Sequence, residues 1–286
     1  MLKIMRAAVL VAALVIAPSY VRADLASVKS ACTGEKSPTI KAIQDRGVLA
    51  WATALIMPVA TKDAQGNFIG VEADNAREFA DILGVKLDLR DYTYDLLPPA
   101  VATGMADIVG ANLYITDTRR KAIDFSDPYN QEGSVFVVLA SRTDLNTIND
   151  LNRAEITVIT GTGTGLVDLA AKFLPKAEQT TADLGTIPEV RFIMIEQADV
   201  TMVDTPRLPV MVKAAQGTPL KFIGPLGVVQ GVPTRADMVD PYDIGFGLRK
   251  GDPGFLDCAN AWVKDLTESG RYQERWKHWL DTLVNN

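Results

Sequence analysis

Arg119 lies in a stretch whose residue types and spacing suit anion binding. The stretch reads Asn-Leu-Tyr-Ile-Thr-Asp-Thr-Arg-Arg-Lys-Ala-Ile-Asp-Phe-Ser-Asp-Pro-Tyr over Asn112–Tyr129. The apolar segment Ile108–Ala111 before it predicts a strand, and Thr116 or Asp117 can cap the short helix that follows. An arginine beside a helix N-terminus can hold a carboxylate through two parallel hydrogen bonds, helped by free backbone N–H groups. A solvated basic face, formed with the two basic residues that follow, is the alternative.

Two further segments could bind a small polar ligand. Thr160–Gly165 joins a predicted strand to a predicted helix, and the backbone N–H groups of such a Gly-rich turn can face an anion. A nucleotide-binding loop is excluded by the missing Gly-Lys-Ser/Thr ending and the spacing, whereas a plain tight turn stays open. Asp204 follows the predicted strand Val200–Val203, at the sheet edge where ligands collect. Its alternative role is to cap the helix that begins near Pro206.

The first 23 residues have the pattern of a cleaved signal peptide. Lys3 and Arg6 precede the apolar run Ala7–Ala17, and Val21-Arg22-Ala23 fits a cleavage site. The run is too short to span a bilayer. The whole chain has a net charge of −6, which argues against nucleic acid and anionic membrane as partners. We therefore expect a soluble periplasmic monomer.

The chain has two cysteines, Cys32 and Cys258. Export would place them where disulfides form, and a bridge would tie the N-terminal arm to a C-terminal helix. Two buried thiols are the alternative. A metal site is disfavoured because His278 is the one histidine and no cysteine cluster exists. No cofactor is expected.

Hydrophobic patterning predicts strands that alternate with helices, which favours an α/β fold whose first half has a largely parallel sheet. The predicted strands are Val48–Ala52, Val85–Arg90, Ile108–Ala111, Ser134–Ala140, Ile156–Ile159, Val200–Val203 and Ile244–Leu248. The predicted helices are Ser37–Arg46, Glu72–Leu83, Tyr94–Thr103, Asn146–Leu151, Leu166–Phe173, Pro206–Ala215, Pro253–Ser269 and Gln273–Leu283. Glu189–Gln197 suits either a strand or a helix.

Ile115–Tyr129 resembles the signature of the family 3 extracellular solute-binding proteins, the periplasmic amino-acid receptors of ABC importers. The resemblance runs from about Thr39 through nearly all of the mature chain and is also strong at Ala198–Pro206 and Gly270–Tyr272. It implies a periplasmic binding protein fold of two α/β domains joined by a two-stranded hinge, and a helix at Glu189–Gln197. Domain 1 would comprise residues 24–130 and 243–286, domain 2 residues 134–240, and the hinge residues near 129–133 and 240–244.

The resemblance also implies which residues hold the ligand. Arg119, together with the backbone of Thr162 and Gly163, would bind the α-carboxylate of an amino acid. Asp204 would bind its ammonium group, to which the residue matching Asn112 usually adds a backbone carbonyl.

Four positions would shape the rest of the site. Tyr94 matches one aromatic wall of the family, but Ile56 stands where another aromatic residue is common. Thr53 stands where an acid or serine is common, so this loop favours a neutral, apolar or modified side chain over a cationic one. Tyr114 replaces a Thr or Ser hydroxyl, which puts that carboxylate contact in doubt.

The expected function is to capture an α-amino acid in the cleft between the domains and to deliver it to an ABC permease. One alternative is an exported dehydratase of the cyclohexadienyl type on the same fold. Glu72 and Asp204 could serve it as acids, but no nucleophile–base pair is readable. A second alternative is a receptor for an opine or organic acid, which would need Arg119 more than Asp204.

Overall fold

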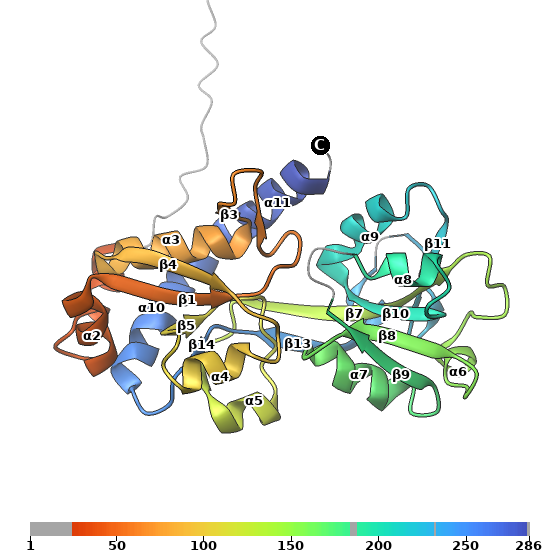
Figure 1. The fold of residues 1–286 in the computed structure, drawn as a ribbon, viewed down its shortest axis with the longest axis horizontal. Helices are drawn as coiled ribbons and strands as arrows, with labels where there is room; N and C mark the ends of the chain where they lie inside the picture. Colours follow the sequence, from red (N-terminus) through yellow and green to blue (C-terminus); the bar gives the residue numbers. More distant parts are fainter. Residues whose placement is uncertain (1–24, 184–187, 232, 285–286) are drawn as a thin grey trace, which may run out of the picture.

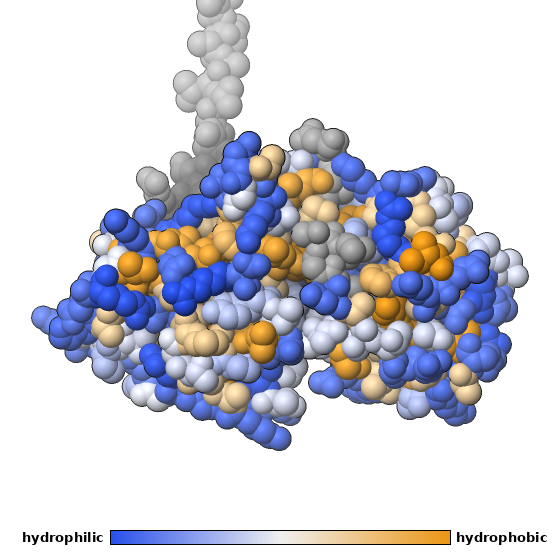
Figure 2. All heavy atoms as spheres, in the orientation of Figure 1, coloured by the Kyte–Doolittle hydropathy of each residue, from blue (hydrophilic) through white to orange (hydrophobic). Residues whose placement is uncertain are grey.

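The computed structural model describes residues 25–183, 188–231 and 233–284, which form two lobes joined by two strands (Figure 1). Residues 1–23, the predicted signal peptide, lie outside the described residues. The first lobe is built on a five-stranded sheet and the second on a seven-stranded sheet. Hydrophilic residues cover much of the face shown in Figure 2, with smaller apolar patches on both lobes. Among the described residues, no helix is both long and apolar enough to cross a membrane.

The five strands of the first sheet are β1 (Val48–Thr53), β4 (Lys86–Asp91), β5 (Ile108–Val109), β6 (Asp124–Phe125) and β14 (Gly247–Leu248). They lie in the order β4-β1-β5-β14-β6. β1 runs parallel to β4 and β5, but β14 runs antiparallel to β5 and β6. The sheet is therefore mixed, but β4, β1, β5 and β6 all run in one direction and β14 alone runs against them, so the prediction of a largely parallel sheet is confirmed. β14 runs in the opposite direction because the chain enters it on its way back from the second lobe, after β13 (Val239–Ile244).

Helices pack on both sides of this sheet: α3 contacts β1 and β4 from one side, and α4 contacts β1, β5 and β14 from the other (Figure 1). The helices of the lobe are α1 (Leu25–Ala31), α2 (Pro38–Arg46), α3 (Val71–Leu83), α4 (Leu97–Ala102), α5 (Asp117–Ala122), α10 (Pro253–Glu268) and α11 (Arg271–Val284), and β2 (Thr61–Lys62) with β3 (Phe68–Ile69) forms a hairpin.

The local sequence explains where two of these helices begin. Ser37 caps α2 by accepting a hydrogen bond from the Ile40 N–H, as predicted. α4 begins at Leu97, not at the predicted Tyr94. Two prolines follow Leu97, and a proline fits the first turn of a helix but not its interior. Tyr94 consequently lies in a loop.

The two strands that join the lobes are β7 (Asn130–Leu139) and β13 (Val239–Ile244). They pair in antiparallel fashion, with Asn130 opposite Ile244 and Ser134 opposite Val239. The predicted strand over Ile244–Leu248 is wrong in its bounds. The chain forms β13 in the second sheet and then β14 in the first, and this change of sheet requires a break between them.

The second sheet has the order β12-β11-β7-β10-β8-β9, with β13 paired to β7; its remaining strands are β8 (Thr157–Gly161), β9 (Glu178–Ala182), β10 (Val200–Asp204), β11 (Leu220–Gly224) and β12 (Gly227–Val228). β10, β8 and β9 are mutually parallel, so their carboxyl ends meet at one edge. The polar edge strand β9 lacks the apolar signal that would have predicted it.

Short helices surround this sheet: α6 (Ile148–Leu151), α7 (Gly165–Phe173), α8 (Val190–Met194) and α9 (Leu208–Ala214), with 3-10 turns at Thr205–Arg207 and Arg235–Asp237. The ambiguous segment Glu189–Gln197 therefore contains a helix. The helix predicted from Pro206 begins with a 3-10 turn and becomes α-helical at Leu208.

The core of the first lobe is aromatic. The rings of Trp51, Phe79, Phe246 and Trp262 pack together with centroid separations of 4.7–6.2 Å. Cys32 and Cys258 form a disulfide that joins α1 to α10 beside this core.

Candidate ligand-binding cleft

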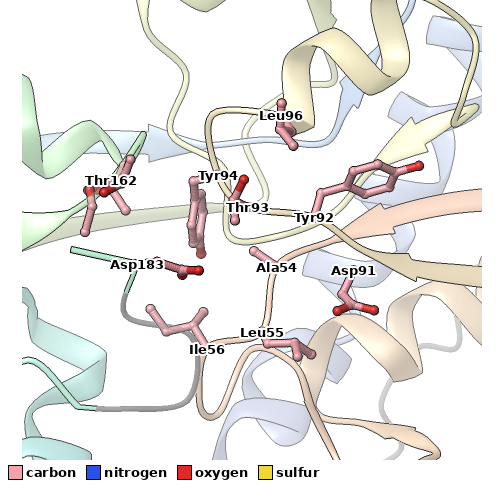
Figure 3. Close-up of a pocket in the computed structure, with 12 residues that line it drawn as sticks. Ala54, Leu55, Ile56, Asp91, Tyr92, Thr93, Tyr94, Leu96, Thr162 and Asp183 are labelled. Carbon is pink, nitrogen blue, oxygen red and sulfur yellow. The ribbon is translucent and has the colours of Figure 1, made fainter. Parts of the chain in front are cut away.

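Most of the predicted site residues converge between the lobes, near the carboxyl ends of β1, β8 and β10. An inner cavity of about 20 Å³ is lined by side chains from both lobes, among them Ile56, Tyr94, Asn112, Tyr114, Arg119 and Asp204. An outer cavity of about 310 Å³ shares Ile56 and Tyr94 with it and also contacts Thr162. Figure 3 shows the outer cavity between the loop after β4 and the strand ends of the second lobe.

Arg119 reaches across the cleft. Its Nη1 donates to the Tyr114 carbonyl and its Nη2 to the Gly163 carbonyl of the second lobe, both at 2.9 Å. No described carboxylate forms an ion pair with it. Burial holds the pKa of the Arg119 guanidinium below its usual range, although Tyr94, Tyr114 and Asp168 oppose this effect. A partly buried cation whose described partners are neutral carbonyls is suited to bind an anion.

The helix α5 sets the position of this guanidinium. Thr116 is its N-cap and accepts a hydrogen bond from the Arg119 N–H. The neighbouring Arg120 is exposed and lies over the Phe125 ring, 5.8 Å from its centroid. Arg119 therefore differs from the basic residue beside it, and the solvated basic face does not describe Arg119.

The Gly-rich turn offers fewer donors than predicted. The Thr162 N–H donates to the Ala182 carbonyl at 2.9 Å, in the β8–β9 ladder. This N–H is therefore engaged within the second lobe, and its contact with a ligand carboxylate stays a prediction; Thr162 lines the outer cavity. Gly163 has φ 72°, and a Cβ there would lie 2.3 Å from the Asp95 backbone nitrogen, so glycine is required. Among described residues nothing accepts from the Gly163 N–H, which leaves it for a ligand.

Asp204 is held by hydroxyl groups. Its Oδ1 accepts hydrogen bonds from Tyr114, Tyr242 and Ser134. Its side chain makes no capping hydrogen bond to the turn that follows, so the capping alternative is not what the structure shows. Burial raises the pKa of Asp204, even though the Tyr114 and Tyr242 hydroxyls favour its charged form.

Asn112 has φ 51°, a conformation that asparagine tolerates better than most residues. Its Nδ2 donates to Glu132 at 2.8 Å, and its Oδ1 accepts from the Tyr272 hydroxyl at 3.3 Å. Burial, followed by the charge of Asp204, raises the pKa of Glu132 to about 8. These contacts fix the Asn112 backbone at the wall of the inner cavity.

Thr53 was predicted to help shape the ligand site, and this prediction is wrong. Thr53 is the last residue of β1, is fully buried and lines neither cavity. Its Oγ1 has no hydrogen-bond partner in the structure. The side chain lies inside the fold because the strand extends one residue further than the predicted Val48–Ala52, so Thr53 is not part of the loop.

Sequence reasoning missed two buried charges at the inner cavity. Arg207 Nη2 donates to Glu189 Oε2 at 2.9 Å, Nη1 donates to Oε1, and Nε donates to the Met57 carbonyl of the first lobe at 3.1 Å. Burial alone would lower the pKa of Arg207, but Glu189 outweighs it and raises that pKa. No pattern in the sequence indicated this pair, because Glu189 lies in the segment that suited two structures.

Two carboxylates of the outer cavity were also missed. Asp91 accepts from Lys62 at 3.0 Å, and Asp183 follows the end of β9. In Figure 3 the Asp183 side chain extends between Tyr94 and Ile56. Asp91 directly follows the predicted strand Val85–Arg90 and is the last residue of β4, which is a detectable signal, whereas β9 was not predicted at all.

Comparison with known proteins identifies the family. Residues 51–282 match the bacterial extracellular solute-binding proteins, family 3. A probable histidine-binding protein of Neisseria gonorrhoeae is 26% identical over 254 residues, which are 86% of this chain and 88% of that protein.

Solved structures of binding proteins also resemble this chain. The ancestral amino acid-binding protein AncCDT-1, described as a precursor of cyclohexadienyl dehydratase, is similar with a TM-score of 0.71 and 31% identity, over 84% of this chain and 99% of that one. An amino acid ABC transporter substrate-binding protein of Streptococcus pneumoniae bound to L-arginine shares the fold, with a TM-score of 0.69 and 23% identity over 84% and 97% of the two chains. The chain therefore belongs to the bacterial extracellular solute-binding proteins of family 3 and has the α/β fold of periplasmic binding proteins.

Proposed function

We propose that this protein captures an α-amino acid between its two lobes in the periplasm and delivers it, as a monomer, to an ABC permease of the inner membrane. The observation that carries the proposal is Arg119, a cation in the cleft that has carbonyl partners but no described carboxylate partner. An α-carboxylate would supply the missing negative charge, and the free Gly163 N–H would add a donor from the second lobe.

The opposite charge of an amino acid also has a partner. Asp204 lines the same inner cavity as Arg119, so a zwitterion placed there would meet both. The relatives described above are named for binding amino acids, histidine or arginine. An opine or simple organic acid would use Arg119 and leave the buried Asp204 without a charged partner.

The side chain of the ligand would extend into the outer cavity. Its walls are Ile56, Tyr94 and the residues around Tyr92, and Asp91 and Asp183 add negative charge. This arrangement admits a large neutral side chain beside Ile56 and Tyr94 and also a cationic one near the two carboxylates, of which Asp91 already pairs with Lys62.

Binding from both lobes would also explain how the permease recognises a loaded receptor. We assign residues 24–130 and 243–286 to one domain, residues 134–240 to the other, and the joining parts of β7 and β13 to the hinge. Because Arg119 and Asp204 belong to different domains in this assignment, a ligand that bridges them favours the closed arrangement.

The test is a thermal-shift screen of the mature chain, refolded from denaturant to remove any carried-over ligand. The panel contains the common amino acids, opines, prephenate, arogenate and simple organic acids. A ligand that binds only the native state raises the melting temperature. We expect a clear shift with one or a few α-amino acids. A shift with non-amino-acid anions alone, or turnover of prephenate or arogenate, would contradict the proposal.

A further inference from the structure

We propose that the hydroxyl groups of Tyr114, Tyr242 and Ser134 position Asp204 for the ligand ammonium and tie that site to the two strands that join the lobes. These three residues are called the hydroxyl cluster. The inference rests on the proposed function, because it assumes that the ligand carries an α-ammonium group.

The cluster gathers three separate parts of the fold on one carboxylate oxygen. Oδ1 of Asp204 accepts from Ser134 on β7 at 3.1 Å, from Tyr242 on β13 and from Tyr114 of the first lobe. The Tyr114 and Tyr242 rings stack with their centroids 3.8 Å apart, and their hydroxyl oxygens are 2.7 Å apart. The Ser134 and Tyr242 oxygens are 2.8 Å apart.

The number of protons decides which of these contacts are hydrogen bonds. The cluster makes five close contacts, but three hydroxyls carry three protons. Donation to a carboxylate is stronger than donation to another hydroxyl, so the protons point to Asp204 when it is ionised. Burial, followed by the nearby Asp204, raises the pKa of both phenols well above its usual value, so both remain donors.

This arrangement leaves one oxygen for the ligand. All three hydrogen bonds fall on Oδ1, and none of the described residues donates to Oδ2. Asp204 lines the inner cavity that Arg119 also lines. Oδ2 is therefore the oxygen available to an ammonium group, and the hydroxyl cluster holds the carboxylate so that Oδ2 cannot exchange places with Oδ1.

The neighbouring backbone is shaped to receive Tyr114. A Cβ at Gly165, the first residue of α7, would lie 2.0 Å from the Tyr114 ring, so glycine is needed for the ring to pack there. The Tyr114 backbone forms a β-bridge with Ile244 at the end of β13. Ser134 stands opposite Asp204 in the β7–β10 pair and opposite Val239 in the β7–β13 pair. Movement of either joining strand therefore moves a donor of Asp204.

The matching experiment compares an amino acid with the same molecule lacking its α-ammonium group. The probe is the panel amino acid with the largest thermal shift, paired with its des-amino acid; for lysine this is 6-aminohexanoate, and for phenylalanine 3-phenylpropanoate. Both dissociation constants are measured by calorimetry for the wild type, Tyr242→Phe and Tyr114→Phe. Phenylalanine retains the ring stack and removes only the donor.

We expect each variant to bind the amino acid about tenfold more weakly, the effect of one hydrogen bond to a charged group. Binding of the des-amino acid should change less than about twofold, because that molecule does not use Asp204. The control is Tyr129→Phe, which removes a phenol that donates to the buried Glu72 at 2.9 Å outside the two cavities. It should leave the ratio of the two constants unchanged.

The outcomes separate this inference from the proposed function. If the wild type binds no amino acid, both fail. If the wild type binds an amino acid but the Tyr242→Phe and Tyr114→Phe variants weaken both probes equally, or neither, the hydroxyl cluster has only a structural role and this inference alone is overturned.

Discussion

The cleft holds two arginines that differ in their partners: one is paired with a carboxylate and the other is bonded to neutral carbonyls. Arg207, from the second lobe, is buried and forms a bidentate ion pair with Glu189. Arg119, from the first lobe, is half-buried and donates to two carbonyls. The neighbouring Glu189 carboxylate raises the pKa of Arg207 against the effect of burial, whereas burial lowers the pKa of Arg119.

The difference shows which charge the protein has already compensated. A buried ion pair is complete within the fold, and breaking it is costly. A desolvated guanidinium with neutral partners is incomplete, and an anion can complete it. Both arginines line the inner cavity, so lining the cavity alone would not distinguish a structural cation from a ligand-binding one.

The largest effect should come from Arg207→Met. The substitution keeps much of the volume and leaves the Glu189 carboxylate buried without its partner, which commonly costs about 3–5 kcal/mol of folding free energy. Urea unfolding followed by circular dichroism would measure it. The control is the double variant Arg207→Met with Glu189→Leu, which should recover most of the loss because no charge stays unpaired. If Arg207→Met kept full stability and lost ligand binding, the two arginines would have exchanged roles.

Arg119→Ala should have the second-largest effect. It should weaken ligand binding and leave the folding stability almost unchanged. Removing one partner of a buried charge pair costs about 2–5 kcal/mol of binding free energy. Because no described carboxylate pairs with Arg119 and would lose its partner, the free energy of unfolding should change by less than about 1 kcal/mol. Calorimetry with the panel amino acid and urea unfolding give the two numbers. Normal binding by this variant would remove Arg119 from the site.

The same contrast extends to carboxylates and gives a pH dependence. Glu189 faces Arg207, whereas Glu132 is buried, faces the amides of Asn112 and Asn130, and feels the charge of Asp204. The pKa of Glu132 rises from 4.5 to about 8 on folding. Between these values the native state binds more protons than the unfolded state, so this group lowers stability as pH increases, by at most about 1.4 kcal/mol per pH unit.

Glu132→Gln should remove this contribution. Urea unfolding of the wild type and the variant at several values between pH 4.5 and 8 gives the difference in their free energies of unfolding. The pKa of Glu72 is also raised, to about 7, but its contribution is common to both proteins and cancels in this difference. The difference should grow in favour of the variant as pH rises. A constant difference would show that Glu132 is ionised throughout.

Much of the fold and part of the cleft were predictable from the sequence. Apolar periodicity located β1, α3, β10 and α10 within a few residues, because these elements bury one face or both. β9 was missed because its residues are exposed or only partly buried, and β11 because it is buried only at its last two residues, so neither strand has a regular apolar pattern. The pairing order of both sheets depends on contacts between distant segments, which no local pattern contains.

The site divides in the same way. Arg119 and Asp204 stand near element ends, so their position and residue type made them candidates, and the family resemblance supplied the role proposed for each. The hydrogen bond that uses the Thr162 N–H depends on β9, and the burial of Thr53 depends on one extra residue of β1. Arg207 was missed because Glu189, its partner, lies in a segment whose structure depends on packing against the second sheet.

The smallest effect should come from Asp168→Asn, which tests how incomplete the charge of Arg119 is. Asp168 is an exposed residue in the first turn of α7, and its charge acts on the guanidinium without forming an ion pair. Because water screens exposed charges, removing it should strengthen binding of the amino acid only about two- to threefold. Calorimetry at low ionic strength would measure the gain, and repeating it in 1 M salt, where the screening length is about 3 Å, should abolish it. Weaker binding by the variant would mean that Asp168 contacts the ligand, and the contrast between a compensated Arg207 and an uncompensated Arg119 would then need a third charged group.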